Sequence, residues 1–455
     1  MLRGNVGSDE RAQADRIHNA LGSATGLNPD SRAEVLVNRH THGLNLDEDG
    51  LGRELSQMAT RDPAASRATI EATMNRLDST DRDDVAEGFT SNLSHQQLRQ
   101  LQGTPDGRAI LDRMSNEMRS GYTADSEQQQ INRIATARTA VNLESNPGFT
   151  ALSETSRNDV RAAIERNQTN PAAVNNIVNL STAPGFRQLS DTTRRDMLNA
   201  LQNHPTDPQF LGQLRNLAGS TEFRGLNDAQ RTSVISDVNR FARTSSYEGM
   251  SAADRGRALN IIGSLSMDSA AHPARPAARN TVEQLVSGRV PMALYNDSTS
   301  GDFGYADGGV MHFNIGNTNL TTNRHELVAT AAHEVNHVLN GNTSAGTRER
   351  FLDEYRAWSM ERQAADGENP ASAAHMRGVI RNLATNAPNG SAYDHLRQLY
   401  RDDAEFRRAI DTVNARLNQS PPVVTTPEQL RVMLRGLPGG ADSDYLNNVG
   451  NDDNH

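Results

Sequence analysis

The sequence predicts a mainly helical protein in which helical repeats precede a smaller α+β domain. Most of the chain carries apolar side chains at helical spacing, separated by short breaks rich in Asp, Ser and Gly. A segment in the middle repeats itself with a period of 37 residues, which is typical of stacked helical hairpins. Strand candidates cluster between residues 290 and 315, directly before a helix that carries two histidines and a glutamate.

Length, charge and hydropathy argue against several classes of protein. With 455 residues, of which 35% are hydrophobic and 4% aromatic, the chain can form two or three domains with lean cores. The formal net charge of −10 argues against a nucleic acid or an anionic membrane as a partner recognised by charge. There is no apolar run of about 18 residues, so we expect no membrane insertion.

The chain contains neither cysteine nor lysine, so all 46 of its basic residues are arginine. Without cysteine, a metal site can use only histidine and carboxylate ligands. Without lysine, no side-chain amine is open to ubiquitin attachment, which would benefit a protein injected into a eukaryotic cell. A genomic preference for arginine is the alternative explanation. Residues 1–30 lack the apolar run of a cleavable secretory signal and are predicted to be a flexible lead or delivery segment.

Residues 31–140 are predicted to form a helical domain, with helices such as 107–118. Residues 45–50 imitate the first half of a calcium-binding EF-hand loop, but Ser56 stands where that loop requires a bidentate glutamate. We therefore expect a capped turn ahead of a helix over 51–59.

Residues 141–269 are predicted to be helical repeats that serve as a scaffold. Two of the repeated sets are Phe149, Phe186 and Phe223, and Arg157, Arg194 and Arg231, with 37 residues between successive members. The repeated arginine could form a ladder that faces a ligand, but ion pairs on helix surfaces or between repeats are the simpler interpretation. A shortened fourth copy begins at Tyr247.

Residues 270–280 contain two prolines among alanines and are predicted to be a linker. Residues 281–419 follow as a separate α+β domain, and residues 420–455 as a C-terminal tail. The strand candidates in the α+β domain are 290–295, 303–306 and 310–315. The last two are joined through Asp307-Gly308-Gly309, a strong signal for a β-hairpin turn.

The clearest chemical signal lies in residues 321–341, which are predicted to form one helix. Within it, His333 and His337 are four residues apart, so both imidazoles lie on one side of the helix and can bind one metal ion. Glu334 lies next to them, where it can act as a general base. An apolar stripe is predicted to bury another side of this helix, and its members are Leu327, Val328, Ala331, Val335, Val338 and Leu339.

A third metal ligand is expected downstream, because catalytic zinc sites take three protein ligands and keep a fourth position open. Residues 347–366 are predicted to form a helix in which Glu354 shares a buried side with three aromatic residues. Asp353 is the competing candidate, but it points about 100° away from Glu354 around the helix. We therefore favour Glu354 as the third ligand.

The H-E-x-x-H motif, followed by a downstream E-x-x-A on the next helix, resembles the gluzincin group of zinc metallopeptidases over residues 295–366. The resemblance implies a zincin-like metallopeptidase domain that binds Zn²⁺ through His333, His337 and Glu354, with Glu334 as the catalytic general base. It also implies that the strand at 310–315 lies along the cleft and pairs with an extended substrate.

The sequence departs from the thermolysin-like pattern at Trp358, where an Asp four residues after the ligand Glu is expected. Another carboxylate or a backbone carbonyl must therefore orient His333. His325 lies off the face of the two ligand histidines and is expected to be a surface or supporting residue. The candidates for stabilising the oxyanion of the reaction are Tyr393, which we favour, and His312, His375 and His395.

These features predict a zinc-dependent endopeptidase that acts as an injected bacterial effector or toxin. In this interpretation the protein is secreted without a cleavable signal peptide and delivered into the cytosol of a target cell. There it would cleave an intracellular protein, while the repeats bind a secretion-apparatus carrier, a chaperone or a host protein. Two alternatives remain: a non-catalytic repeat protein with a structural zinc site, and an antibacterial toxin that cleaves peptidoglycan.

Overall fold

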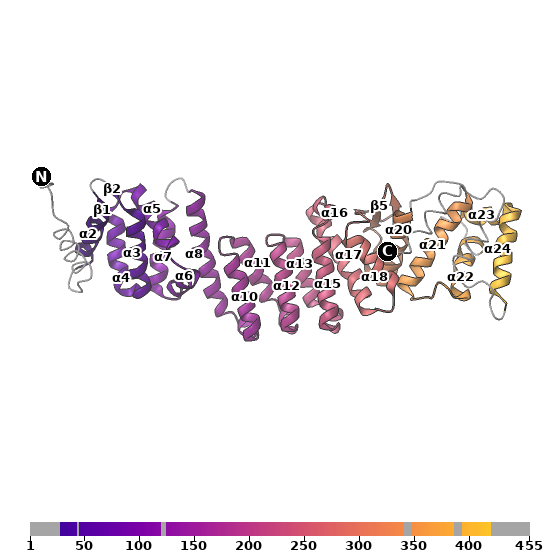
Figure 1. Ribbon diagram of the computed structural model, residues 1–455, viewed down its shortest axis with the longest axis horizontal. Helices are drawn as coiled ribbons and strands as arrows, with labels where there is room; N and C mark the ends of the chain where they lie inside the picture. Colours follow the sequence, from indigo (N-terminus) through magenta and orange to yellow (C-terminus); the bar gives the residue numbers. More distant parts are fainter. Residues whose placement is uncertain (1–27, 43–44, 120–123, 341–346, 386–393, 420–455) are drawn as a thin grey trace, which may run out of the picture. The chain divides into compact units, whose positions relative to one another are not determined.

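A computed structural model describes residues 28–42, 45–119, 124–340, 347–385 and 394–419 of the chain. These residues are mainly helical, with one two-stranded and one three-stranded sheet (Figure 1), so the predicted helical class is confirmed. The chain falls into two compact units, divided after Arg187, with residues 204–206 belonging to the first. A search of the described helices finds none with the length and apolar character that spanning a membrane requires.

The first unit consists of short helices joined by capped turns. Its strands β1 (Thr41–His42) and β2 (Asn45–Leu46) form a small antiparallel pair. Its helices are α2 (Pro29–His40), α3 (Glu48–Arg61), α4 (Pro63–Arg76), α5 (Ser79–Ser91), α6 (His95–Gln102), α7 (Pro105–Glu117), α8 (Asp125–Glu144), α9 (Pro147–Thr150), α10 (Glu154–Arg166) and α11 (Pro171–Ser181). The Asp47 side chain caps α3 by accepting a hydrogen bond of 3.0 Å from the Gly50 amide, which confirms the predicted capped turn.

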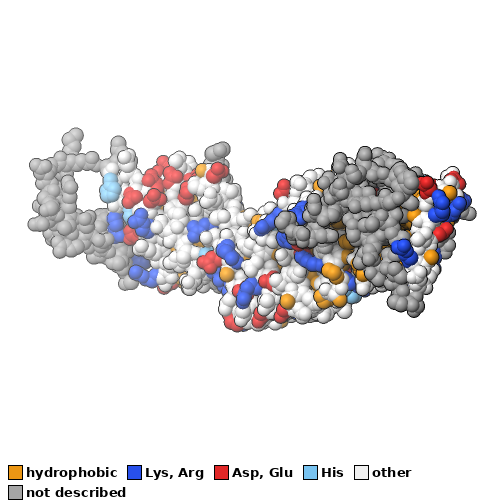
Figure 2. Space-filling model, turned by 45° about the vertical axis from the view of Figure 1, so that its right-hand side comes forward, with side chains coloured by type: hydrophobic (Ala, Val, Ile, Leu, Met, Phe, Trp, Pro, Cys, Tyr) orange, Lys and Arg blue, Asp and Glu red, His pale blue; other side chains and the backbone are white. Residues whose placement is uncertain are grey.

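Acidic side chains gather on one face of the first unit, as the red atoms in Figure 2 show. On the contacting helices α3 and α5 of this unit, Asp81 and Asp84 of α5 lie close enough to Glu48, at the start of α3, for its charge to act on them. Partial burial, together with these neighbouring carboxylates, raises the pKa of both aspartates. Part of the net negative charge of the chain is therefore concentrated on this face.

The second unit begins with stacked helices that continue the repeat. They are α12 (Asp191–Asn203), α13 (Pro208–Gly219), α14 (Thr221–Gly225), α15 (Asp228–Phe241), α16 (Ser245–Glu248), α17 (Ala252–Ala271) and α18 (Pro276–Val286), while η1 (Phe186–Gln188) lies at the division between the units. Figure 1 shows α12, α15 and α17 side by side, and these helices contact one another in that order. Each repeat opens with a short turn that buries an aromatic side chain: Phe149, Phe186, Phe223 or Tyr247.

The repeated arginine fastens this short turn to the helix that follows it. Arg231 donates to the carbonyl oxygen of Arg224 at 3.0 Å, and it also pairs with Asp228. In the fourth copy, Arg255 donates to the carbonyl oxygen of Tyr247 at 3.1 Å. These contacts favour the interpretation that the arginines are structural over a ladder that faces a ligand.

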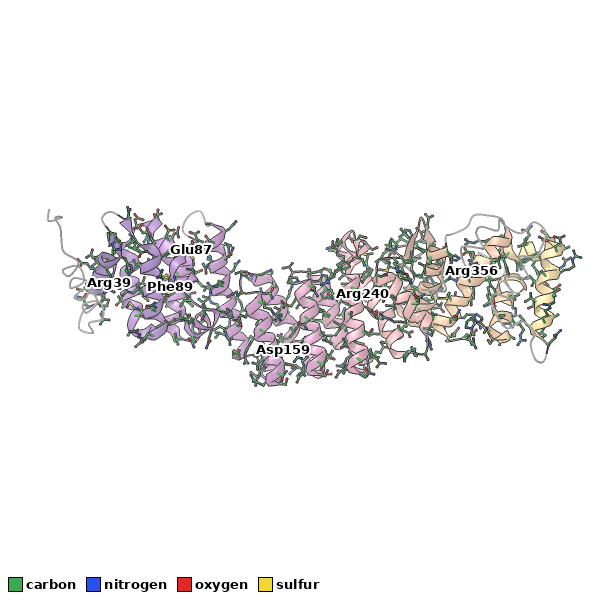
Figure 3. The ribbon with its side chains drawn as sticks, viewed as in Figure 1. Arg39, Glu87, Phe89, Asp159, Arg240 and Arg356 are labelled. Carbon is green, nitrogen blue, oxygen red and sulfur yellow. The ribbon has the colours of Figure 1, made fainter. Side chains whose placement is uncertain are left out.

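The segment 270–280, predicted to be a linker, contains the end of α17 and the beginning of α18, and both sides of it lie in the same compact unit. Pro276 is the first residue of α18, a position where proline fits a helix because it needs no amide hydrogen bond. Arg240 on α15, labelled in Figure 3, binds Glu283 on α18 at 2.6 and 2.8 Å. The α17–α18 pair therefore packs onto the repeats as their fourth copy.

The three predicted strands are present as β3 (Met292–Tyr295), β4 (Gly304–Asp307) and β5 (Val310–Asn314). Gly308 and Gly309 form the tight turn between β4 and β5 with φ values of 56° and 75°, which glycine adopts without strain. However, β5 lies between β4 and β3, antiparallel to the former and parallel to the latter. The expectation that 310–315 pairs with a substrate is therefore wrong, because both edges of that strand are occupied. Among the described residues, the outer strands of this sheet are β3 and β4.

Two long helices complete the second unit beside this sheet. They are α20 (Arg324–Asn340), preceded by α19 (Thr318–Thr322), and α21 (Thr347–Ala365). The chain continues with α22 (Ala373–Ile380), η2 (Arg381–Thr385), α23 (Asp394–Asp402) and α24 (Ala404–Leu417). Helix α20 contacts β4, β5, α17, α18 and α21, so it is held on several sides. Its predicted apolar stripe is largely buried, although Leu339 at its end is exposed.

Replacing Gly52 by alanine should destabilise the first unit. A Cβ atom at this position of α3 would lie 2.6 Å from the backbone nitrogen of Phe89 on α5 (Figure 3) and 2.8 Å from the Val85 carbonyl oxygen. Because backbone atoms cannot rotate away, we expect a loss of about 1–3 kcal/mol in the free energy of unfolding. Thermal unfolding followed by circular dichroism measures this change.

The matched control is Gly212→Ala, because Gly212 is also the fifth residue of its helix, α13, and a Cβ atom there meets nothing within 4 Å. This substitution should be neutral or stabilising by up to about 1 kcal/mol, since alanine favours a helix. Equal effects of the two substitutions would contradict a close crossing of α3 and α5.

Candidate metal centre

The three predicted ligands meet between α20 and α21. The Nε2 atoms of His333 and His337 lie 3.1 Å apart. The Oε2 atom of Glu354 lies 3.5 Å from the first and 3.6 Å from the second. A tetrahedral zinc ion with bonds of about 2.0–2.1 Å holds its ligand atoms roughly 3.3 Å apart. The three atoms therefore form a triangle that one ion fits.

The surroundings of Glu354 also fit a cation. Only 2% of this residue is exposed, and its Oε2 atom has no hydrogen-bond partner within the described part of the chain. Its other oxygen accepts from Arg350 at 2.6 Å. Since an unpaired buried carboxylate oxygen is costly, this atom has the character of a metal ligand. The group of His333, His337 and Glu354 could thus bind a metal ion, and the donor set suits zinc among other divalent ions.

Carboxylates support both imidazoles from behind. Glu361 lies 3.1 Å from Nδ1 of His333, and Asp353 lies 2.9 Å from Nδ1 of His337. Each pair fixes the ring so that its Nε2 atom faces the centre. The predicted need for another carboxylate at His333 is therefore met by Glu361, while Trp358 packs edge-on against the same ring at 6.3 Å.

Asp353 lies outside the triangle, because its carboxylate contacts Nδ1 of His337, the ring nitrogen that faces away from the centre. It also lies 3.7 Å from Arg350. The choice of Glu354 over Asp353 as the residue in the triangle agrees with this arrangement.

The site carries an excess of negative charge. Four carboxylates, those of Glu334, Asp353, Glu354 and Glu361, lie around two imidazoles with Arg350 as the partner of two of them. Burial disfavours the imidazolium form of His333, but the nearby carboxylates of Glu354 and Glu361 outweigh it and raise its pKa to about 10. Burial likewise opposes ionisation of Glu354, but the two histidines lower its pKa. The centre therefore attracts protons or a metal cation.

Glu334 is the residue predicted from the sequence to be the general base. It follows His333 directly on α20 and is partly buried. Burial raises the pKa of Glu334, while the imidazoles of His333 and His337 act in the opposite direction. A carboxylate with a raised pKa accepts a proton more readily, which suits acid–base chemistry near neutral pH.

The remaining residues singled out from the sequence lie in different environments. His375 is buried between Ser359 at 2.8 Å and Glu368 at 2.9 Å, and burial lowers its pKa, so it supports the packing of α21 and α22. His395 is exposed on α23, and His325 is exposed and pairs with Asp366 at 2.8 Å. The favoured oxyanion candidate, Tyr393, lies outside the described residues.

His312 on β5 stacks on Tyr305 of β4, with ring centres 4.5 Å apart. One residue at the centre was not anticipated from the sequence. It is Glu361, although it lies seven residues after Glu354 and therefore on the same side of α21.

Zinc should stabilise the protein, and a chelator should reverse this stabilisation. Because a ligand that binds only the folded state raises the unfolding temperature, the midpoint should rise with zinc concentration. Glu361→Gln and Asp353→Asn should each weaken the metal affinity about 10- to 100-fold, and His337→Ala should abolish binding. Competition with a chromophoric chelator measures the affinities.

The matched control is Asp366→Asn, which breaks a similar His–carboxylate contact of 2.8 Å at an exposed position outside the centre. Its metal affinity should equal that of the wild type. If it instead fell as far as those of Glu361→Gln and Asp353→Asn, the supporting role of these two carboxylates would be refuted.

Comparison with known proteins yields no relative: no protein family, no curated protein and no solved structure matches the chain. The geometry of the centre therefore carries its interpretation alone.

Proposed function

We propose that the protein is a zinc-dependent peptidase. The observation that carries this proposal is the triangle of His333 Nε2, His337 Nε2 and Glu354 Oε2, with the partly buried carboxylate of Glu334 beside it. Structural zinc sites are usually closed by four protein ligands, whereas three ligands and a neighbouring carboxylate are typical of hydrolytic sites.

In this proposal the residues divide the chemistry between them. Bound zinc would polarise the carbonyl of the peptide bond and lower the pKa of water. Glu334 takes a proton from the attacking water and delivers it to the nitrogen of the leaving amine. Asp353 and Glu361 hold the two imidazoles in position through both steps. Tyr393 remains our candidate for a hydrogen-bond donor to the oxyanion.

We place the substrate along β4 instead of β5. The outer edge of β4 has no partner strand among the described residues, so its amides and carbonyls can pair with an extended peptide. β4 also lies close to the metal-bearing helix, because a Cβ atom on Gly304 would approach the Thr330 methyl of α20 to 3.3 Å. Thr330 precedes His333 by less than one helical turn.

We further propose that the peptidase is an effector or toxin that is delivered into a target cell. The absence of lysine from a chain with 46 basic residues supports a stay in a cytosol where ubiquitin is attached to lysine. In this setting the helical repeats bind the carrier, a chaperone or a host protein, and an intracellular protein is cleaved.

Glu334→Gln should abolish hydrolysis while zinc stays bound. The amide cannot accept the proton of the attacking water, so kcat should fall by at least about 100-fold. Mass-spectrometric detection of new peptide termini measures the activity, and elemental analysis measures the zinc. Glu326→Gln is the control, since Glu326 lies in the first turn of the same helix. Undiminished cleavage by Glu334→Gln would refute the mechanism, and zinc without any cleavage by the wild type would favour a structural site.

The place of action can be tested by expression in two compartments. The wild type should be toxic in a eukaryotic cytosol, and Glu334→Gln should not be, because toxicity depends on hydrolysis. Toxicity confined to the bacterial periplasm would favour the peptidoglycan-cleaving alternative instead.

A further inference from the structure

One face of the three-stranded sheet carries a row of aromatic rings. Tyr305 of β4 stands opposite His312 of β5, and their rings stack at 4.5 Å with an angle of 9° between the planes. The ring of Tyr295 on β3 lies 5.2 Å from that of Tyr305. Side chains alternate between the faces of a strand, so these three rings share one face.

The opposite face of the sheet is the one that the core covers. Met311 and Phe313 of β5 are fully buried there, and Gly304 points toward Thr330 of α20. By contrast, Tyr305 is 43% exposed, and only it and Leu339 stand out as exposed large hydrophobic side chains in the described ranges. The packing of the sheet therefore does not account for the exposed ring of Tyr305.

The aromatic face lies in a negative field. Residues 290–316 contain three aspartates and no arginine, in a chain in which 46 residues are basic. Burial raises the pKa of Tyr295 to about 12, and the carboxylates of Asp302, Asp297 and Glu334 act in the same direction. Two arginines of the neighbouring helices α20 and α21 have carboxylate partners of their own, since Arg324 pairs with Glu222 and Arg350 with Glu354.

We propose that this aromatic face, formed by Tyr295, Tyr305 and His312 beside Asp302, binds an arginine side chain of the peptide substrate. A guanidinium group is planar, so it can stack on the exposed Tyr305 ring while its N–H groups donate to the Asp302 carboxylate. Asp302 is exposed and accepts only a hydrogen bond of 2.8 Å from Ser300 among the contacts of its carboxylate.

This inference rests on the proposed function and specifies its substrate class. The strand that carries Tyr305 also carries Gly304, where a Cβ atom would approach the Thr330 methyl of the metal-bearing helix α20 to 3.3 Å, so the sheet packs against that helix. The arginine would therefore lie near the bond that is cut. Charge complementarity favours arginine over other substrate side chains. An acidic side chain would be repelled by the carboxylates of residues 290–316, and a neutral one would not compensate their charge.

The test compares arginine with citrulline, which has nearly the same shape but no charge. The zinc-loaded full-length wild type is first used to digest a peptide library, and a well-cut peptide with arginine near the cleavage site is resynthesised with citrulline. We expect kcat/KM to be about tenfold lower for the citrulline peptide, as one desolvated cation–π contact would give. The arginine preference should fall toward one in Tyr305→Ala and in Asp302→Asn.

Asp366→Asn is the matched control. It removes the same charge from an exposed aspartate outside residues 290–316, whose carboxylate pairs with His325. This variant should keep the arginine preference of the wild type. An equal loss in all three variants would show a general effect of charge or folding and would overturn the proposed site, as would equal cleavage of the two peptides by the wild type.

A binding measurement separates this inference from the proposed function. Fluorescence anisotropy of zinc-loaded Glu334→Gln with labelled arginine and citrulline peptide pools does not depend on turnover. Tighter binding of the arginine pool, lost on adding Tyr305→Ala, supports the aromatic site even if the wild type cuts no peptide. Equal binding of both pools overturns it even if the wild type is an active peptidase.

Discussion

The contact between α20 and α21 is the constraint on which the second unit depends. It brings the imidazoles of His333 and His337 against a buried carboxylate, with further carboxylates behind each ring. Burying so many ionisable groups costs free energy unless their charges are compensated. Protons on the histidines can supply part of this compensation, and a divalent cation at the centre can supply it with fixed geometry. The packing of α20 against α21 and the binding of a cation between them are therefore linked, because the cation would compensate the charges that the packing buries.

The repeats give this helix pair a rigid support. The fourth repeat, formed by α17 and α18, contacts both α20 and α21 and is itself tied to α15 through Arg240 and Glu283. A metal site needs its ligands held within a few tenths of an ångström, and helices achieve this more readily than loops. The predicted role of the repeats as a scaffold agrees with these contacts, in which α17 and α18 pack against the helices that carry the three candidate ligands.

The three-stranded sheet packs against the metal-bearing helix α20 on one face and exposes the ring of Tyr305 on the other. Because β5 takes the middle position, the outer edge of β4, close to α20, has no partner strand among the described residues, and Tyr295, Tyr305 and His312 lie on the face of the sheet opposite the buried Phe313. In the proposed complex, an extended peptide on that edge would lie close to α20, and one of its side chains would reach the exposed ring of Tyr305. The strand order therefore offers the proposed substrate two binding surfaces: the outer edge of β4 for its backbone and the exposed ring of Tyr305 for one side chain.

The sequence by itself determined the features that depend on local spacing. The four-residue interval sets His333 and His337 on one side of a helix, two glycines in succession make the β4–β5 turn, and the period of 37 residues predicts the stacked helices. Only the tertiary structure decided which groups meet across elements. It placed Asp353 behind His337, gave Glu361 the role that Trp358 could not fill, inserted β5 between its neighbours and made 276–280 the start of a helix. The physical reason is that side-chain spacing is fixed by the local backbone, whereas strand order and contacts between helices follow from the packing of distant segments.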